Sequence, residues 1–193
     1  MTLSRLWSRI MNRLRRPKPP RCSKLEFGCG EKTPKEGFVG ADVRKFEHVE
    51  YVCNAWDIGK FVPEGTITEI YSRHFFEHLT FIQADLTLEA WKRILAPGGV
   101  LQIIVPDIRY HIEQFLNPDP SAPSATFDGW TVLQHALAGF WGWQRGGDTA
   151  IWDIHKSGYD YRCLKMKLEE HDFTDVRRLD DEPWNLNVVC RKN

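Results

Sequence analysis

Short apolar runs separated by turn residues dominate the chain from residue 24 onward and constrain its fold more than any other feature. Five runs of strand length occur in the first half, at residues 24–27, 38–41, 49–53, 67–71 and 100–105. Before the last run, a helical repeat of apolar residues ends at a Pro-Gly-Gly turn; its members are Ala84, Leu88, Trp91, Ile94 and Leu95. This alternation predicts an α/β fold with an open, mostly parallel sheet.

The connections among the first three runs are unusually short. Only residues 31–37 lie between Gly30 and the second run, and the third run follows after a similarly short connection. A parallel crossover needs a dozen or more residues when it contains a full helix. We therefore expect the first half of the sheet to be reduced.

An aromatic-rich insertion of about residues 107–159 follows the fifth run. It contains a Pro-rich loop at residues 117–123, a second helical repeat at residues 132–141 and four of the eight tryptophans. Asp160 can cap a further helix, and strand-like runs at residues 174–179 and 185–191 bring the sheet to about seven strands. The aromatic rings predict either a lid over a ligand or a small core that ties the insertion to the sheet.

Residues 1–23 differ in character from the rest and are predicted to form a basic amphipathic helix followed by a Pro-rich linker. Leu3, Leu6, Trp7 and Ile10 repeat at helical spacing, and Pro17 marks the end of the pattern. Such a face either packs on the chain's own core or attaches residues 1–16 to an anionic membrane surface or a partner protein.

The charge distribution and the cysteines limit the classes of binding partner and the cellular compartment that we expect. Residues 1–24 carry eight Arg or Lys and no acid, which leaves 18 basic and 26 acidic side chains in the remainder. An acidic body disfavours nucleic acid as a partner. Five cysteines without C-x-x-C spacing argue against a disulfide framework or a cysteine zinc site, and no apolar run is long enough to span a bilayer. We expect a cytoplasmic protein, with a peripheral membrane contact as the alternative.

A glycine turn directly after the first strand is the sharpest candidate for a ligand site. In Gly28-Cys29-Gly30, glycine allows positive φ and close approach of the backbone to a ligand. Asp42 ends the next strand, where a carboxylate can accept hydrogen bonds from both hydroxyls of an adenosine ribose. The pair indicates a nucleoside-containing ligand.

Several motifs in this order resemble the class I S-adenosylmethionine-dependent methyltransferases. They comprise residues 26–30, Asp42, residues 54–57, residues 72–79 and residues 93–101. The resemblance covers about residues 24–107, resumes at residues 155–176, and is greatest to small members whose glycine turn leads almost directly into the second strand. It implies a Rossmann-like fold for residues 24–193 and S-adenosylmethionine as the cofactor.

The resemblance also implies roles for individual residues in holding the cofactor. Glu26 would help hold the ammonium group, backbone at Gly28, Cys29 and Gly30 would touch the methionine and ribose portions, and Asp42 would hold the ribose.

The third and fourth strands contribute further implied contacts. Asn54 and Ala55 match the loop that meets adenine, and the backbone around Arg73 and His74 matches the segment that faces the methionine carboxylate and amine.

A general base matters most if the methyl acceptor is a hydroxyl group. The candidates are His74 and Asp107, which follow parallel strands, and His155, which the insertion brings back toward the sheet. Glu77 and His78 are expected to stabilise the turn after the fourth strand. No metal ion is expected.

Three rival interpretations remain open. Residues 74–78 spell H-x-x-E-H, the inverted zinc-protease motif, which requires a helix and a further ligand. Gly28 and Gly30 also begin the G-x-G of a nicotinamide dinucleotide site, although Thr33 stands where the third glycine belongs. The third rival is a non-catalytic binding module with the same fold, recruited to a membrane or partner by its first helix.

The sequence thus predicts an enzyme that transfers a methyl group from S-adenosylmethionine. A small-molecule or glycan-type acceptor fits the acidic body and the aromatic insertion better than a nucleic acid does.

Overall fold

The computed structural model describes residues 22–144, 146–147, 150–180 and 182–193. The amphipathic helix predicted within residues 1–16, and its contacts, lie outside this range. Within it, no helix has the length and apolar character needed to cross a bilayer.

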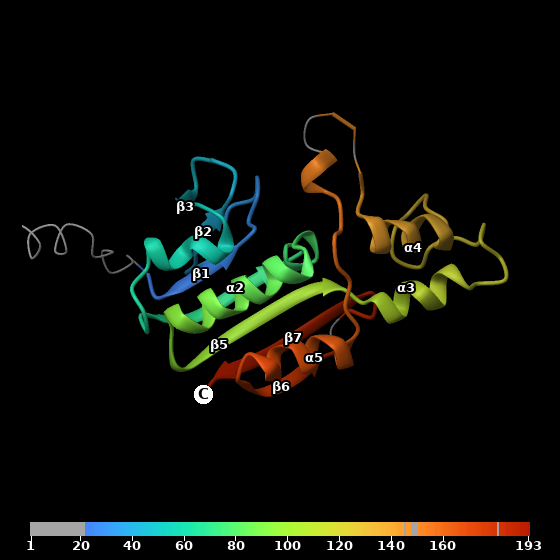
Figure 1. Cartoon of the computed structure of the whole chain (residues 1–193). Coiled ribbons are helices and arrows are strands. Elements are labelled where there is room, and N and C mark those ends of the chain that lie inside the picture. Colours follow the sequence, from blue (N-terminus) through green and yellow to red (C-terminus); the bar gives the residue numbers. More distant parts are fainter. Residues whose placement is uncertain (1–21, 145, 148–149, 181) are drawn as a thin grey trace, which may run out of the picture.

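A seven-stranded sheet forms the centre of the molecule, in the order β3-β2-β1-β4-β5-β7-β6 (Figure 1). Neighbouring strands pair in parallel from β3 to β5, and β7 pairs antiparallel with both β5 and β6. The predicted α/β fold with about seven strands is confirmed. The strands are β1 (Lys24–Phe27), β2 (Val39–Asp42), β3 (Val49–Val52), β4 (Ile67–Arg73), β5 (Leu95–Pro106), β6 (Phe173–Leu179) and β7 (Asn185–Lys192).

The helices are α2 (Phe81–Ile94), α3 (Ile108–Phe115), α4 (Val132–Trp141) and α5 (Tyr161–Glu170), with the short 3₁₀ segments η1 (Ala55–Lys60), η2 (Phe76–His78) and η3 (Ala150–Trp152). Thr80 and Gln83 form a capping box that starts α2, and Asp160 caps α5 as predicted. Leu95 belongs to β5 rather than to the preceding helix, because β5 begins before the Pro-Gly-Gly turn and pairs with β4 across an irregular register.

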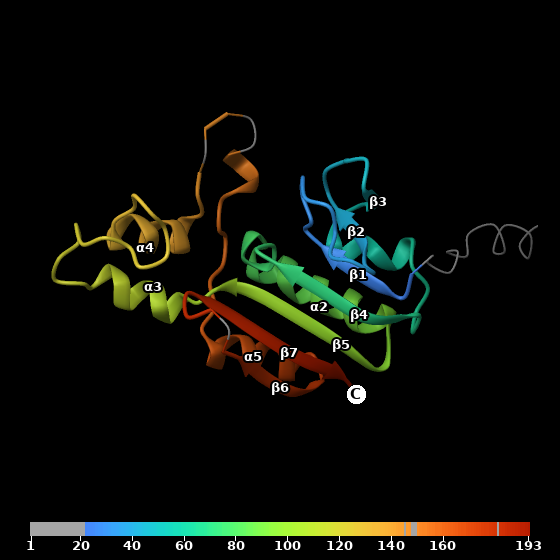
Figure 2. The ribbon, with the colours of Figure 1, turned by 180° about the vertical axis from the view of Figure 1, so that it is seen from behind.

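The first half of the sheet is reduced, as the short connections predicted. Residues 28–38 and 43–48 join β1 to β2 and β2 to β3 without a helix. Helices α2 and α5 lie on one face of the sheet, and the view from behind shows the strands in front of them (Figure 2).

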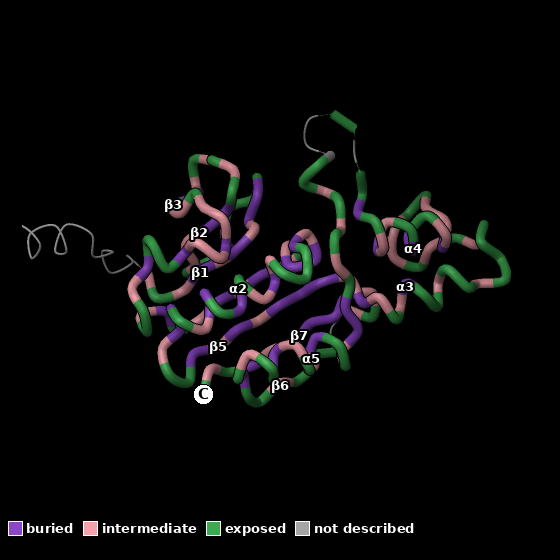
Figure 3. The backbone as a smooth tube through the Cα atoms, viewed as in Figure 1, coloured by how far each residue is buried: buried purple, intermediate pink, exposed green. Residues whose placement is uncertain are grey.

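The core lies between α2 and the central strands, where each element turns its buried residues toward the other (Figure 3). Trp91 is fully buried at its centre, with its ring centroid 4.8 Å from that of Phe27 and 6.0 Å from that of Phe76. Phe27 ends β1 and Phe76 follows β4, so the Trp91 side chain packs against the ends of two strands.

The insertion forms a unit of its own beyond the end of β5 (Figure 1). Helix α4 packs on α3, and the rings of Phe115 and His111 both contact Phe140. The chain then returns to the sheet, where the backbone carbonyl of Glu77 accepts hydrogen bonds from the amides of Lys156 and Ser157. The insertion therefore has a small aromatic core, and its return segment is hydrogen-bonded to the turn that follows β4.

We predict that Trp91→Ala lowers the free energy of unfolding by about 3–5 kcal/mol, because it opens a cavity where the helix meets both strand ends. Leu86→Ala in the same helix is the matched control, since Leu86 is 45% exposed, and its change should stay within about 0.5 kcal/mol. Equilibrium denaturant unfolding measures both. Equal effects would show that the Trp91 contacts do not anchor the helix.

Candidate functional site

A cavity of about 280 Å³ lies at the carboxyl ends of the parallel strands. Parallel sheets bind ligands at this edge, because the strand ends and their loops converge there. The residues implicated by the sequence that line this cavity are Gly28, Asp42, Asn54, Ala55 and His74.

Asp42 joins the end of β2 to the glycine turn after β1. Its Oδ2 accepts a hydrogen bond from the Gly30 amide at 2.9 Å, and its Oδ1 accepts one from the Arg44 amide at 2.8 Å. The side chain is nearly buried, and it borders the cavity. An ionised carboxylate has about four acceptor positions, so both oxygens keep capacity for a further donor.

Gly28 has φ of 74°, and its place in the turn depends on the absence of a side chain. A Cβ at this position would overlap the Phe75 side chain, which packs against the turn. Both residues line the cavity. The glycine therefore serves the packing of β1 against the segment after β4, and that packing shapes the cavity wall.

The insertion closes part of this cavity with residues that the sequence did not single out. Ile151, Trp152 and Lys156 line it, and the guanidinium carbon of Arg44 lies 5.9 Å from the centroid of the Trp152 ring. No local pattern distinguishes Trp152 from the other tryptophans, so only the path of the return segment brings it here.

A second cavity of about 550 Å³ adjoins the first and shares His74, His78 and Asp153 with it. Aromatic side chains from the insertion and the loop before β7 form much of its wall, together with several histidines. These residues are Phe127, Trp143, Trp184, His111, His135 and His155.

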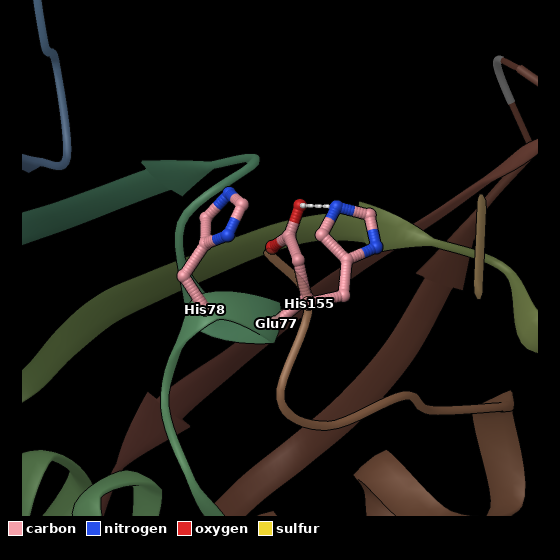
Figure 4. A group of neighbouring side chains, drawn as sticks. All are labelled: Glu77, His78 and His155. Atoms are coloured by element: carbon pink, nitrogen blue, oxygen red, sulfur yellow. Dashed lines mark ion pairs between the residues drawn. The ribbon is translucent and has the colours of Figure 1, made fainter. Parts of the chain in front are cut away.

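Glu77 lies buried between the histidines at the border of the two cavities (Figure 4). Its Oε1 is 3.4 Å from Nδ1 of His74 and 4.0 Å from Nε2 of His155. Burial by itself raises the pKa of this carboxyl group, but His74, His78 and His155 outweigh that effect and place its pKa below the usual range.

The three candidate bases occupy different places. His74, with φ of 51°, borders both cavities. His155 lines the second cavity, and burial lowers its pKa although Glu77 opposes the effect. Asp107 lines neither cavity: it caps α3 and pairs with Nη1 of Arg178 at 2.7 Å. The structure therefore does not bring Asp107 to the site, because its carboxylate is engaged by the start of α3 and by β6.

Solved structures of similar architecture were found at low sequence identity. A SAM-dependent methyltransferase from Archaeoglobus fulgidus aligns with a TM-score of 0.55 at 14% identity, over 98% of this chain and 92% of that one. One from Mesorhizobium loti aligns with a TM-score of 0.52 at 13% identity, over 94% and 96%. The chain has the class I SAM-dependent methyltransferase fold.

A third solved structure matches over only part of its own length, and the comparisons by sequence found no match. The CurJ carbon methyltransferase aligns with a TM-score of 0.52 at 16% identity over 95% of this chain, which spans only 52% of the CurJ chain. No protein-family model matches the chain, and no curated protein matches it in sequence.

Some residues that the methyltransferase resemblance implicates do not line the first cavity. Glu26 alternates with the buried Phe27 along β1 and accepts a hydrogen bond from the Lys35 amide at 2.6 Å. Cys29 is buried, which raises the pKa of its thiol to about 11. Arg73 pairs with Glu182 and borders the second cavity. Gly30 contributes its amide to Asp42. Their cofactor contacts stay predictions.

The two rival enzyme geometries are not present in the described residues. The H-x-x-E-H motif begins at positive φ and continues into the single 3₁₀ turn η2, so it lacks the α-helix of an inverted zinc-protease site. A dinucleotide site needs a helix that starts at the glycine turn, whereas residues 31–38 contain none.

We predict that His111 makes stability depend on pH. Its burial lowers its pKa from 6.5 to about 4, so between these values the unfolded chain binds a proton that the folded chain does not. Stability is then lost as pH falls through this window, at up to about 1.4 kcal/mol per pH unit.

Denaturant unfolding of the wild type and His111→Phe at several pH values tests this. The variant keeps a ring against Gly139, which the His111 ring contacts so closely that a Cβ there would overlap it. We expect a shallower slope in the variant. The same slope in both proteins would contradict the assignment.

Proposed function

We propose that this protein is an S-adenosylmethionine-dependent methyltransferase that acts on a small-molecule or glycan-type acceptor. The observation that carries the proposal is the cavity at the strand ends, where Asp42 and the segment after β3 meet His74 in a methyltransferase fold. The similar solved structures, which include SAM-dependent methyltransferases, support the same activity.

The cavity residues suit an adenosyl ligand. Asp42 is fixed by two backbone amides and retains acceptor positions for the ribose hydroxyls. Asn54 and Ala55 border the neighbouring part of the wall, where an amide side chain and a small apolar one suit the edge and face of adenine. Trp152 and Lys156 from the insertion complete the lining and help to exclude water.

The bound cofactor supplies a methyl group on a sulfonium, which is already activated for in-line displacement. The chain's own task is then to align the acceptor and exclude water, and effective molarities for such alignment correspond to about 7–11 kcal/mol of the barrier. His74 borders both cavities, so it is suited to orient an acceptor hydroxyl group and take its proton.

The second cavity supports an acceptor with planar or sugar-like surfaces. Phe127, Trp143 and Trp184 provide ring faces, and the histidines provide hydrogen-bonding groups. It shares a wall with the first cavity, which gives a methyl group a short path between two ligands. A glycan or a small metabolite fits this lining better than a long polyanion.

We predict that S-adenosylhomocysteine at about 100 times its Kd raises the unfolding temperature by roughly 5–10 °C, since such binding adds about 2.7 kcal/mol. Asp42→Ala should lose the shift, because it removes the group that faces the ribose. Glu50→Gln, which changes an exposed carboxylate on the neighbouring strand β3, should keep it.

Thermal unfolding of the three proteins with and without ligand is the measurement. No shift in the wild type at millimolar ligand would leave the non-catalytic binding module as the better account. Equal shifts in the wild type and Asp42→Ala would reject the ribose assignment alone.

A further inference from the structure

Glu77 is a buried carboxylate whose nearest donor groups are histidine ring nitrogens, with Nδ1 of His74 at 3.4 Å and Nε2 of His155 at 4.0 Å from Oε1. Its side chain is 2% exposed, and neither Oε1 nor Oε2 has a hydrogen-bond partner among the described residues. An unsatisfied buried charge costs several kcal/mol. The Glu77 oxygens therefore remain free to take a further partner at the wall of the second cavity.

Two histidines face this carboxylate from opposite sides (Figure 4). One ring nitrogen of His78, one of His155 and a carboxylate oxygen of Glu77 all lie within 4.8 Å of one another. Glu77 and His78 come from η2 after β4, and His155 comes from the return segment of the insertion. Hydrogen bonds from the Lys156 and Ser157 amides to the Glu77 carbonyl hold the return segment beside η2.

Backbone carbonyls orient both imidazole rings. Nδ1 of His155 lies 2.9 Å from the Gly139 carbonyl oxygen, and Nδ1 of His78 lies 3.0 Å from that of Ile154. A carbonyl only accepts, so each Nδ1 donates to it. The lone pair of a neutral His155 ring then lies on Nε2, which is 4.0 Å from Oε1 of Glu77. Histidine ligands of metal ions are commonly held in this way by a second hydrogen bond.

We propose that Glu77, His78 and His155 form a binding site for one divalent transition-metal ion. Two imidazoles and one carboxylate are ligands typical of zinc and of non-haem iron sites that keep an open coordination position. Bonds of about 2.0–2.2 Å would draw the three ligand atoms closer together than they now lie.

This ligand set differs from the one that the linear motif suggests. H-x-x-E-H would pair His74 with His78 and use Glu77 as a base. Here Glu77 is itself a ligand, and the second histidine comes from residue 155, far along the chain. His74 lies 3.4 Å from Oε1 of Glu77, with its side chain 45% exposed, and remains outside the group.

The position of the site gives it a role that rests on the proposed function. All three residues line the second cavity, and His78 also lines the first. An open coordination position at this border would hold an oxygen of the acceptor beside the cofactor cavity.

Cobalt(II) titration of the full chain, freed of metal by a chelator, tests the site without any cofactor. We expect one Co²⁺ per chain, with visible d–d absorption that Zn²⁺ abolishes by displacement. Glu77→Gln and His155→Gln should each weaken binding by more than about 100-fold, beyond the roughly 10- to 100-fold that changes outside the ligand set cost.

Asp85→Asn and His171→Gln are the matched controls, because they alter a separate carboxylate–histidine pair with Nε2 and Oδ1 3.0 Å apart. Both should bind Co²⁺ as the wild type does. Circular dichroism checks the fold of each variant. If Glu77→Gln does not fold, Co²⁺ binding by the wild type and His155→Gln is compared instead.

Three outcomes of the Co²⁺ titration alone overturn the site, and a fourth comes from comparing it with cofactor binding. They are equal binding by the wild type and His155→Gln, loss of binding in His74→Gln with retention in His155→Gln, and a near-ultraviolet thiolate band that reveals cysteine ligands. A chain that binds S-adenosylhomocysteine but no Co²⁺ also overturns it and leaves the proposed function intact. A chain that binds Co²⁺ but no S-adenosylhomocysteine supports the metal site and removes its link to methyl transfer.

Discussion

The packing of Trp91 against the strand ends is the contact on which the rest of the structure depends. Its ring contacts Phe27 at the end of β1 and both Phe75 and Phe76 after β4. The first of these segments leads into the glycine turn. The second lies between His74 and the Glu77-His78 pair. Because the core is close-packed, a shift of α2 would be transmitted to both. Phe27 and Phe75 also line the first cavity, so the cavity wall and the histidine cluster share one support.

The insertion covers part of a site that the strands leave open. The strands supply Asp42 and His74, but the edge of an open sheet is exposed to water, and the reduced first half provides no helix to cover it. The return segment compensates by lying across the strand ends and contributing Trp152 to one cavity and His155 to the other. Water is thereby restricted where polar groups gather, which strengthens their electrostatic interactions.

Sequence reasoning predicted the sheet well, because it rests on local signals. Alternating apolar residues, short connections and turn residues indicated a reduced seven-stranded sheet, and the end of β2 indicated Asp42 beside the glycine turn. It did less well where two distant segments meet. Asp107 had the right position after β5 for a base, yet Arg178 from β6 and the start of α3 occupy its carboxylate. Glu26 was assigned by resemblance to hold the cofactor's ammonium group; it alternates with the buried Leu25 and Phe27 along β1, and its role stays a prediction.

By itself, the sequence determined the order of the elements and which strand ends carry polar residues, since hydrophobic periodicity and chain connectivity are local properties. The tertiary structure alone decided which of those polar groups are buried together. From the sequence, Glu77 and His78 are expected to be turn residues after the fourth strand, and His155 is expected to lie in the insertion. They form a cluster because the Glu77 carbonyl binds the return segment through the amides of Lys156 and Ser157. That contact joins residues about 80 positions apart, and no local pattern encodes it.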